Sequence, residues 1–494
     1  MPLVSTKAEI MRYLNPFRIL VLCLVFVQFG VRVEAGDHDQ TAAPTYGEAV
    51  ALLETWIQSI VDYDRLPGMS LAIVHDQEIA YAKGFGSSDR DHGVEATPNT
   101  IYGICSIAKV FTGIAVMQLR DAGKLNLDDP VEKHLPWFSP VELEPDSRSP
   151  TLGDLLHHSG GLPCEPDQTF WTEPEQLYPT REELIERVST LKMSYPPNTT
   201  FNYSNLGYSL LGEVISVVSG MEYADYVREN ILDPLGLDAT TPFMPESLPG
   251  NDIAKGYGPR PRNGSRIEIL NRDQKALTPA SGFASTAEDL ANFAMWQFRV
   301  LDGEDSRVLK RETLQEMHSM QWPDPAWGFG FTLWQMGDQT FVGHQGGCFG
   351  YQSQLIISPE EKIAVVVMVN AWDAPQFTLV FRTYEIMAPV LKSLHSKKTE
   401  KSQWAEYAGF YTSGNSWSDA EVLWWNDTLV VLWVPGGNPN PIGSLTKLSR
   451  VEGEVFREVG ADGKLGKHYI FRRDAAGNVV GLKFNNNVLT KQAL

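Results

Sequence analysis

The 494-residue sequence has few cysteines, few basic residues and no long apolar run. Its four cysteines are too few to build the fold on a disulfide framework. Lys and Arg total 41 against 61 Asp and Glu, a formal charge of −20, so no basic surface is available for a phosphate backbone. We therefore exclude a disulfide-stapled scaffold and a nucleic-acid-binding protein. Because 43% of the residues are hydrophobic and only 21% are charged, we expect a large globular core.

The longest N-terminal apolar run, Ile19–Phe29, is shorter than the roughly 18–20 residues that span a bilayer. Basic residues precede the run, and Val33 and Ala35 offer small side chains at the positions that signal peptidases prefer. This layout predicts that residues 1–35 are a secretory signal peptide, with an uncleaved anchor as the alternative. We expect a mature chain that begins near Gly36, is secreted or periplasmic, and has no stable membrane span.

Hydrophobic patterns predict strands at both ends of a long first domain and helices between them. Two β-rich runs near the N-terminus, Ser70–Val74 and Glu78–Phe85, are typical of a hairpin. Helical spacing follows Ser106 as far as Gly123, and it recurs over residues 205–219. Further strands are expected at Phe329–Gln335, Thr340–His344, Ser353–Ile357 and Ile363–Val369, joined by short turns. The order predicts an α/β layered enzyme whose antiparallel sheet takes strands from both ends of the domain.

The chain changes character after a polar stretch at residues 396–403, which we interpret as a linker. Residues 36–395 form the predicted first domain, and residues 404–494 are predicted to form a separate small β domain, barrel-like in architecture. Its expected hairpins are Glu421–Trp425 with Leu429–Val434, and His468–Arg472 with Val479–Phe484. The sequence leaves the role of this domain and the oligomeric state open.

A candidate nucleophile lies in Ser106-Ile107-Ala108-Lys109. A serine hydroxyl attacks poorly until a base accepts its proton. If a helix begins at Ser106, Lys109 lies one turn later on the same face, and a buried lysine can lose its proton near neutral pH. The alternative interpretation of this segment alone is a capped helix with a surface lysine.

Two further segments carry groups suited to acid–base and oxyanion chemistry. Tyr203 and Asn205 belong to a Tyr-Ser-Asn segment, in which a phenol could shuttle a proton and an amide could orient a lysine or a substrate. The alternative is a loop that caps a helix. Residues 343–347 read Gly-His-Gln-Gly-Gly at the end of a predicted strand, where glycines allow close approach of backbone N–H groups and His344 offers a donor. The alternative there is a glycine-rich turn.

Together, in this order, the three segments resemble the serine β-lactamase and penicillin-binding protein superfamily, and most closely its class C β-lactamase, D,D-carboxypeptidase and esterase branch. The family signature is S-x-x-K, Y-x-N, and K-T-G or its H-x-G variant; here it reads SIAK, YSN and HQG. Other segments agree: PGMSLAIVHD from Pro67, LLHHSGGLP from Leu155, LDPLGLDAT from Leu232 and SGFASTAEDLANF from Ser281. The resemblance covers about residues 47–392. It implies a β-lactamase/transpeptidase-like fold: an antiparallel sheet flanked by helices, with an all-helical region.

The resemblance also implies an acyl-enzyme mechanism without metal or cofactor. Ser106 would attack a carbonyl, Lys109 and Tyr203 would act as the coupled general base, and the backbone N–H groups of Ser106 and Gly347 would form the oxyanion hole. Substrate-positioning roles fall to Asn205, His344, Gln345 and Gly346. The expected partner is a small ester, amide or peptide-like substrate. The alternatives are a β-lactamase or penicillin-binding D,D-peptidase, and a non-catalytic sensor or binding protein on the same fold.

The departures from the signature bear on the substrate. His344 replaces a lysine and Gln345 replaces a small hydroxyl residue that helps to hold a substrate carboxylate, so efficient β-lactam turnover is not expected. Cys105 and Cys348 adjoin the nucleophile and the oxyanion loop; we interpret them as small buried hydrophobic residues, with oxidation control of the site as the alternative. Removal of the signal peptide leaves three cysteines, so at least one is expected to stay free or to pair between chains.

Overall fold

The computed structural model describes residues 44–140, 147–166, 178–248, 250–262, 265–270, 272–393, 404–414, 419–426, 428–434 and 439–492. These residues belong to one compact unit, Gln40–Leu494. The predicted signal peptide and linker lie outside the described residues. Within the described ranges, no helix has both the length and the hydropathy that crossing a bilayer requires.

The first domain is built on a nine-stranded sheet in the order β3-β2-β1-β13-β12-β11-β10-β9-β8. The strands are β1 Gly68–His75, β2 Glu78–Asp89, β3 Val94–Glu95, β8 Trp322–Pro323, β9 Ala326–Trp327, β10 Thr332–Met336, β11 Gln339–Cys348, β12 Tyr351–Ser358 and β13 Ile363–Val369. β1 pairs antiparallel with β13, with Met69 opposite Val369. The predicted antiparallel sheet with strands from both ends of the domain is therefore confirmed.

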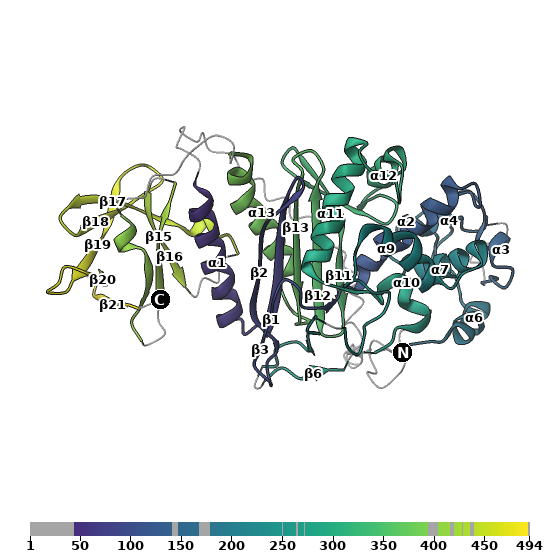
Figure 1. Cartoon of the computed structure of the whole chain (residues 1–494), viewed down its shortest axis with the longest axis horizontal. Coiled ribbons are helices and arrows are strands. Elements are labelled where there is room, and N and C mark those ends of the chain that lie inside the picture. Colours follow the sequence, from purple (N-terminus) through teal and green to yellow (C-terminus); the bar gives the residue numbers. More distant parts are fainter. Residues whose placement is uncertain are drawn as a thin grey trace, which may run out of the picture. The chain divides into compact units, whose positions relative to one another are not determined.

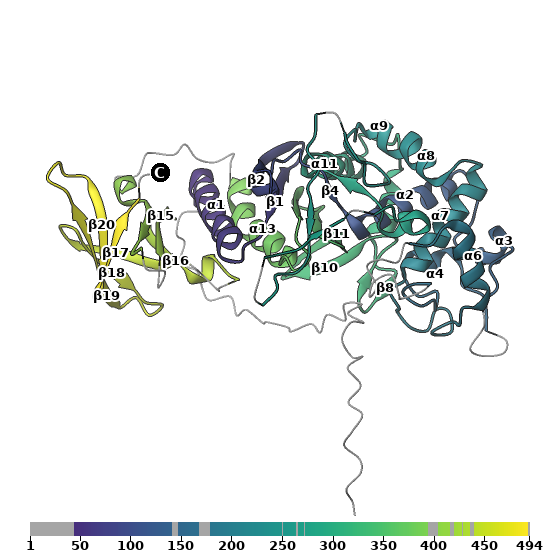
Figure 2. The same cartoon turned by 90° about the horizontal axis from the view of Figure 1, so that it is seen from below.

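Helices cover both faces of this sheet (Figures 1 and 2). The long helices are α1 Tyr46–Tyr63, α2 Ala108–Asp121, α7 Asn205–Ser219, α11 Ala287–Asp302 and α13 Gln376–Ser393. α1 and α13 lie side by side on one face and share a core with Val365 and Val367 of β13, whereas α2, α7 and α11 share the other core with Ala364 and Val366. β13 is an unbroken apolar run because successive side chains enter two different cores.

Shorter elements connect these layers. They are α3 Val131–His134, α4 Leu152–Leu156, α6 Arg181–Thr190, α8 Tyr223–Val227, α9 Asp233–Leu235, α10 Thr278–Ser281, α12 Arg311–His318, β4 Tyr102–Gly103, β5 Gly256–Tyr257, β6 Glu268–Ile269, β7 Ala284–Ser285, η1 Cys105–Ile107, η2 Arg228–Leu232, η3 Lys275–Leu277, η4 Ala405–Tyr407 and η5 Ile442–Ser444.

The N-cap of α11 is Thr286, whose side chain accepts from the Asp289 N–H at 3.1 Å. Ser285 cannot cap the helix because it belongs to β7, paired with Tyr102 of β4.

The C-terminal domain is a closed eight-stranded barrel, which confirms the predicted barrel-like architecture. Its strands are β14 Gly409–Thr412, β15 Asp419–Trp425, β16 Thr428–Val434, β17 Thr446–Glu452, β18 Val455–Val459, β19 Leu465–Arg473, β20 Val479–Phe484 and β21 Asn487–Lys491. Inward side chains such as Val422 and Val431 pack with Tyr411 in a core of the barrel's own, whereas Leu423 and Trp425 join the core formed by α1 and α13. β15 and β16 are apolar on both faces for this reason.

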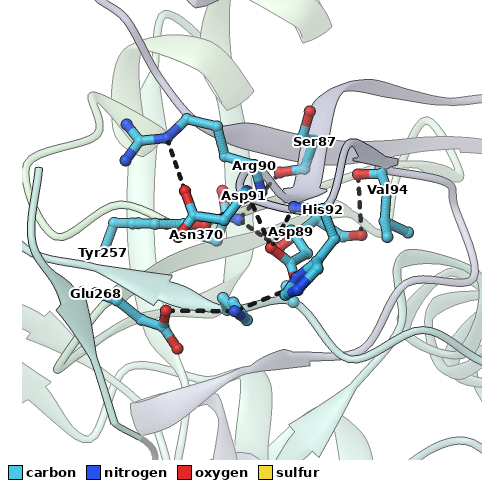
Figure 3. A network of polar contacts seen from close by, with 12 residues as sticks. Ser87, Asp89, Arg90, Asp91, His92, Val94, Tyr257, Glu268 and Asn370 are labelled. Carbon is cyan, nitrogen blue, oxygen red and sulfur yellow. Dashed lines mark hydrogen bonds and ion pairs between the residues drawn. The ribbon is translucent and has the colours of Figure 1, made fainter. Parts of the chain in front are cut away.

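A polar network ties the end of β2 to the β5–β6 hairpin (Figure 3). The Lys255 ammonium lies 3.3 Å from both the Asp89 and the Glu268 carboxylates, and His92 Nδ1 lies 2.6 Å from Asp89. Asn370, just after β13, donates to the Ser87 carbonyl at 3.2 Å. Since ion pairs near the surface contribute little each, this network serves to position the loops at this end of the sheet.

Candidate active site

The candidate nucleophile and its lysine lie where η1 runs into α2. Lys109 is fully buried, and its Nζ lies 3.2 Å from Ser106 Oγ, 2.7 Å from Asn205 Oδ1 and 2.6 Å from the Ala280 carbonyl. The structure thus brings the predicted serine and lysine together at the start of a helix. The alternative of a capped helix with a surface lysine does not fit this burial.

Burial lowers the pKa of Lys109 to about 7, with the charges of Glu165 and Cys164 acting in the opposite direction. A lysine with that pKa is a mixture of ammonium and amine at neutral pH. Its neutral form can accept the proton of a hydroxyl 3.2 Å away. The position therefore suits a general base.

The Tyr203-Ser204-Asn205 segment reaches the same point from the start of α7. Ser204 caps this helix, since its Oγ accepts from the Gly207 N–H at 3.0 Å. The cap and the site coexist, because Asn205 then directs its amide to Lys109. The Lys109 Nζ lies 4.8 Å from the centre of the Tyr203 ring. Burial raises the pKa of Tyr203 well above its ordinary value, while a hydrogen bond with Ser106 lowers it, so the phenol keeps its proton at neutral pH.

His158 contacts the Tyr203-Ser204-Asn205 segment, and the motifs did not indicate this contact. Its Nδ1 accepts from the Ser204 N–H at 3.1 Å, and its ring lies 4.3 Å from that of Tyr203. Trp327 of β9 packs edge-on against Tyr203 and His344 at 5.8 and 5.4 Å between ring centres. These aromatic rings restrain the Tyr203 phenol from two sides.

His344 of β11 is fully buried. Its Nδ1 lies 2.5 Å from the Gln345 carbonyl, and its Nε2 has no hydrogen-bond partner among the described residues. Burial, and next the Lys109 charge, lower the pKa of His344 to about 3, so the imidazole is neutral at physiological pH. Gln345, as the next residue of the strand, directs its side chain to the other face; it lies opposite Gln354 in the register of β11 and β12. The structure does not place the His344 and Gln345 side chains together.

Gly346 allows β11 to lie against the nucleophile segment. A Cβ at this position would lie 2.1 Å from the Ile104 carbonyl oxygen and 2.2 Å from Ser353 Oγ. Ser353 itself donates to the Ile104 carbonyl at 2.9 Å. This close approach requires glycine and brings the strand that carries Gly347 against the backbone that leads into Ser106.

Cys105 and Cys348 form a disulfide with a Cα–Cα distance of 5.6 Å. Our interpretation of these residues as buried hydrophobic thiols is correct for their burial, at 0% and 5% exposure, but wrong for their chemistry. The packing of β11 on η1 brings two cysteines 243 residues apart in sequence to bonding distance. The bond covalently joins the residue before Ser106 to the residue after Gly347. Cys164 keeps its thiol.

We expect loss of this disulfide to destabilise the protein. Replacement of both Cys105 and Cys348 by Ala should lower the free energy of unfolding by about 2–4 kcal/mol, the typical contribution of a disulfide. Denaturant unfolding followed by fluorescence measures the change, and mass spectrometry of non-reduced peptides should show the linkage. Cys164→Ala is the matched control, since it removes a thiol outside the bridge. An unchanged unfolding midpoint in the double variant would contradict the expectation.

Glu165 is a site residue that no motif indicated. It is 5% exposed, and it accepts a hydrogen bond from Asn205 Nδ2. It follows the LLHHSGGLP segment, so proximity to that segment was the only signal in the sequence. Its contact with Asn205 spans 40 residues and depends on tertiary packing.

The sequence profile of the family described as Beta-lactamase matches residues 53–383. Protein flp of Staphylococcus aureus (strain MW2) is 27% identical over 322 residues, which cover 64% of this chain and only 62% of that relative. Penicillin-binding protein 4 of Amycolatopsis lactamdurans is 25% identical over 327 residues, covering 64% of this chain and 84% of the relative. The octameric penicillin-binding protein homologue from Pyrococcus abyssi superposes with a TM-score of 0.60 and 27% identity, over 90% of this chain and all of that one.

The fold defines a β-lactamase/transpeptidase-like protein with an added C-terminal barrel. The family profile covers well over half of the chain, so the chain belongs to the β-lactamase family, a family of serine hydrolases that includes penicillin-binding proteins. The resemblance inferred from the three motifs is confirmed.

Proposed function

We propose that this protein is a serine hydrolase that cleaves ester or amide substrates through an acyl-enzyme. The observation that carries the proposal is the buried Lys109 amine, which lies within hydrogen-bond reach of both Ser106 Oγ and Asn205 Oδ1. A buried lysine facing a hydroxyl has little structural value, because burial of its charge is unfavourable. A low pKa suits a lysine that acts as the base for Ser106.

In the proposed reaction, Ser106 Oγ attacks the carbonyl carbon of the substrate while Lys109 Nζ accepts the hydroxyl proton, with Tyr203 as the relay. The oxyanion would be stabilised by the N–H groups of Ser106 and Gly347. Tyr203 then delivers the proton to the leaving group, and the C–O or C–N bond breaks. Water attacks the acyl-serine, the proton returns through the same groups, and the carboxylic acid leaves.

We propose that preferred substrates lack an essential carboxylate. His344, at the position of the signature lysine, is buried and neutral, so it offers no charge to an anion. Loss of one charge-assisted hydrogen bond lowers affinity by about tenfold to a hundredfold. Short-chain esters and peptide-like amides avoid this loss. The β-lactamase or D,D-peptidase alternative depends on such an anchor, and a non-catalytic binding protein would not need a lysine of low pKa.

A fluorophosphonate probe followed by a substrate panel tests the proposal. We expect the probe to label Ser106, with no labelling of Ser106→Ala, and p-nitrophenyl esters and D-amino acid amides to be cleaved better than nitrocefin. Ser70→Ala, at a buried serine whose hydroxyl donates to the Thr97 carbonyl, is the matched control and should still be labelled. Labelling elsewhere would contradict the assignment of the nucleophile. Nitrocefin turnover near about 10⁷–10⁸ M⁻¹s⁻¹ would make β-lactamase the better description.

We also propose that the enzyme acts outside the cytoplasm, because residues 1–35 have the layout of a signal peptide. N-terminal sequencing of exported protein should find a start near Gly36. A retained N-terminus in a membrane fraction would favour the anchor.

A further inference from the structure

One amide connects Glu165 to Lys109. The Asn205 side chain, which is 7% exposed, presents Oδ1 to Lys109 Nζ at 2.7 Å and donates from Nδ2 to Glu165 Oε1. Glu165 and Lys109 are themselves buried, so water does not compete strongly for these bonds. The carboxylate, the amide and the amine therefore form a continuous chain that ends at Ser106 Oγ.

The carboxylate decides which end of the amide faces the lysine. An amide group has nearly the same shape after a flip that exchanges its oxygen and nitrogen. An ionised carboxylate only accepts hydrogen bonds, so Glu165 selects the orientation in which Nδ2 faces it and Oδ1 faces Lys109. The flipped amide would direct its N–H donors at an ammonium group and leave two acceptors facing each other at Glu165.

Glu165 also contributes a negative charge to this series of hydrogen-bonded groups. The titratable groups that act on or contact the Lys109 amine are Glu165, Cys164, Tyr203, Tyr208, His158 and His344. The charge of Glu165 raises the pKa of Lys109 against the larger effect of burial, and it also raises the pKa of Tyr178 and Tyr203. Removal of the charge would therefore lower the pKa of the amine further.

We propose that Glu165 is a positioning residue for the Ser106–Lys109 pair: it holds the Asn205 amide with its oxygen toward Lys109 and keeps a negative charge behind that amide. The inference rests on the proposed function, since the Ser106–Lys109 pair is assigned there. Glu165 contacts the Asn205 amide, which in turn contacts Lys109. It acts on the reaction through Asn205 and through the ionisation of Lys109.

The pH profile of Ser106 labelling separates this role from a merely structural one. The second-order rate of fluorophosphonate labelling is measured across neutral pH for the wild type, Glu165→Gln and Glu165→Asp, with Glu182→Gln on the exposed face of α6 as the matched control. In Glu165→Gln, the rising limb of the labelling rate plotted against pH should move to lower pH. The plateau of that curve should fall about tenfold to a hundredfold. Glu165→Asp keeps the charge on a shorter arm, so its limb should stay in place while its plateau falls.

If the rising limb of the pH profile of Glu165→Gln overlays that of the wild type, the proposal is overturned, whatever the height of the plateau. If Glu165→Gln does not fold, a double-mutant cycle of Glu165→Asp with Asn205→Ala tests the role instead. The effect of Glu165→Asp on the labelling rate should vanish in the Asn205→Ala background, and an effect that persists there would overturn the role.

Direct titration of Lys109 by NMR on ¹⁵N-lysine-labelled protein, assigned with Lys109→Ala, does not require activity. The Lys109 signal should titrate at lower pH in Glu165→Gln than in the wild type; an unchanged titration would overturn the proposal. If the probe does not label wild-type Ser106, the proposed function fails on that result, and the NMR titration still tests Glu165.

Discussion

Lys109→Ala is expected to lower the rate of Ser106 acylation by about 10²–10⁴, the usual loss when a general base is removed. Lys109 Nζ lies 3.2 Å from Ser106 Oγ, and burial lowers its pKa to about 7. The neutral amine increases as the pH rises through that value, so wild-type labelling should rise with pH over the same range. The second-order rate at which a fluorophosphonate labels Ser106, measured at several pH values across neutrality, reports how readily the serine attacks and measures both effects.

Lys109→Arg should not restore the rate, because a guanidinium stays protonated and cannot accept the serine proton. Lys83→Ala is the matched control: that lysine pairs with Glu54 at 2.8 Å near the surface and should not alter acylation. Near-normal acylation in Lys109→Arg would show that the base lies elsewhere.

Tyr203→Phe is expected to lower amide hydrolysis by about 10²–10⁴ and p-nitrophenyl ester hydrolysis by less, because both substrates lose the relay for the attack of Ser106 and only the amide also loses its proton donor. The substitution keeps the ring that packs on His158 but removes the hydroxyl. An amine leaves only after protonation, whereas p-nitrophenolate leaves without a proton. The ratio of the two kcat/KM values therefore reports delivery of the proton, and steady-state kinetics on one ester and one amide measure it.

Tyr208→Phe provides the matched control for this experiment. The Tyr208 ring also lies near Lys109, at 5.4 Å, but its hydroxyl turns away and donates to the Leu156 carbonyl at 2.7 Å. Its ester-to-amide ratio should equal that of the wild type. Equal losses on ester and amide in Tyr203→Phe would indicate that the phenol acts in the attack of Ser106 or positions the substrate, and does not protonate the leaving group.

The local spacing of apolar residues in the sequence was enough to predict the architecture. Apolar runs such as Ile363–Val369 predicted strands, and the spacing after Ser106 predicted the helix that follows the nucleophile. Paired β runs separated by short polar turns predicted the hairpins of the barrel. These predictions succeeded because the period of apolar residues follows directly from the geometry of a strand or a helix.

The same holds for the central site residues. Ser106 and Lys109 are one helical turn apart, so their proximity follows from local geometry. Asn205 joins them as the Y-x-N motif implied, although its bond to Lys109 spans 96 residues. In that case the order of the motifs, rather than any single spacing, indicated the contact.

Only the tertiary structure decided the disulfide, the contact of Glu165 with Asn205 and the burial of His344. The Cys105–Cys348 bond requires β11 to pack on η1 at the approach that Gly346 permits. Glu165 meets Asn205 because a loop after α4 lies against the start of α7. His344 is buried because the rings of Tyr203 and Trp327, from distant segments, pack against it. None of these contacts has a period or a spacing in the sequence, since each depends on how distant elements pack against one another.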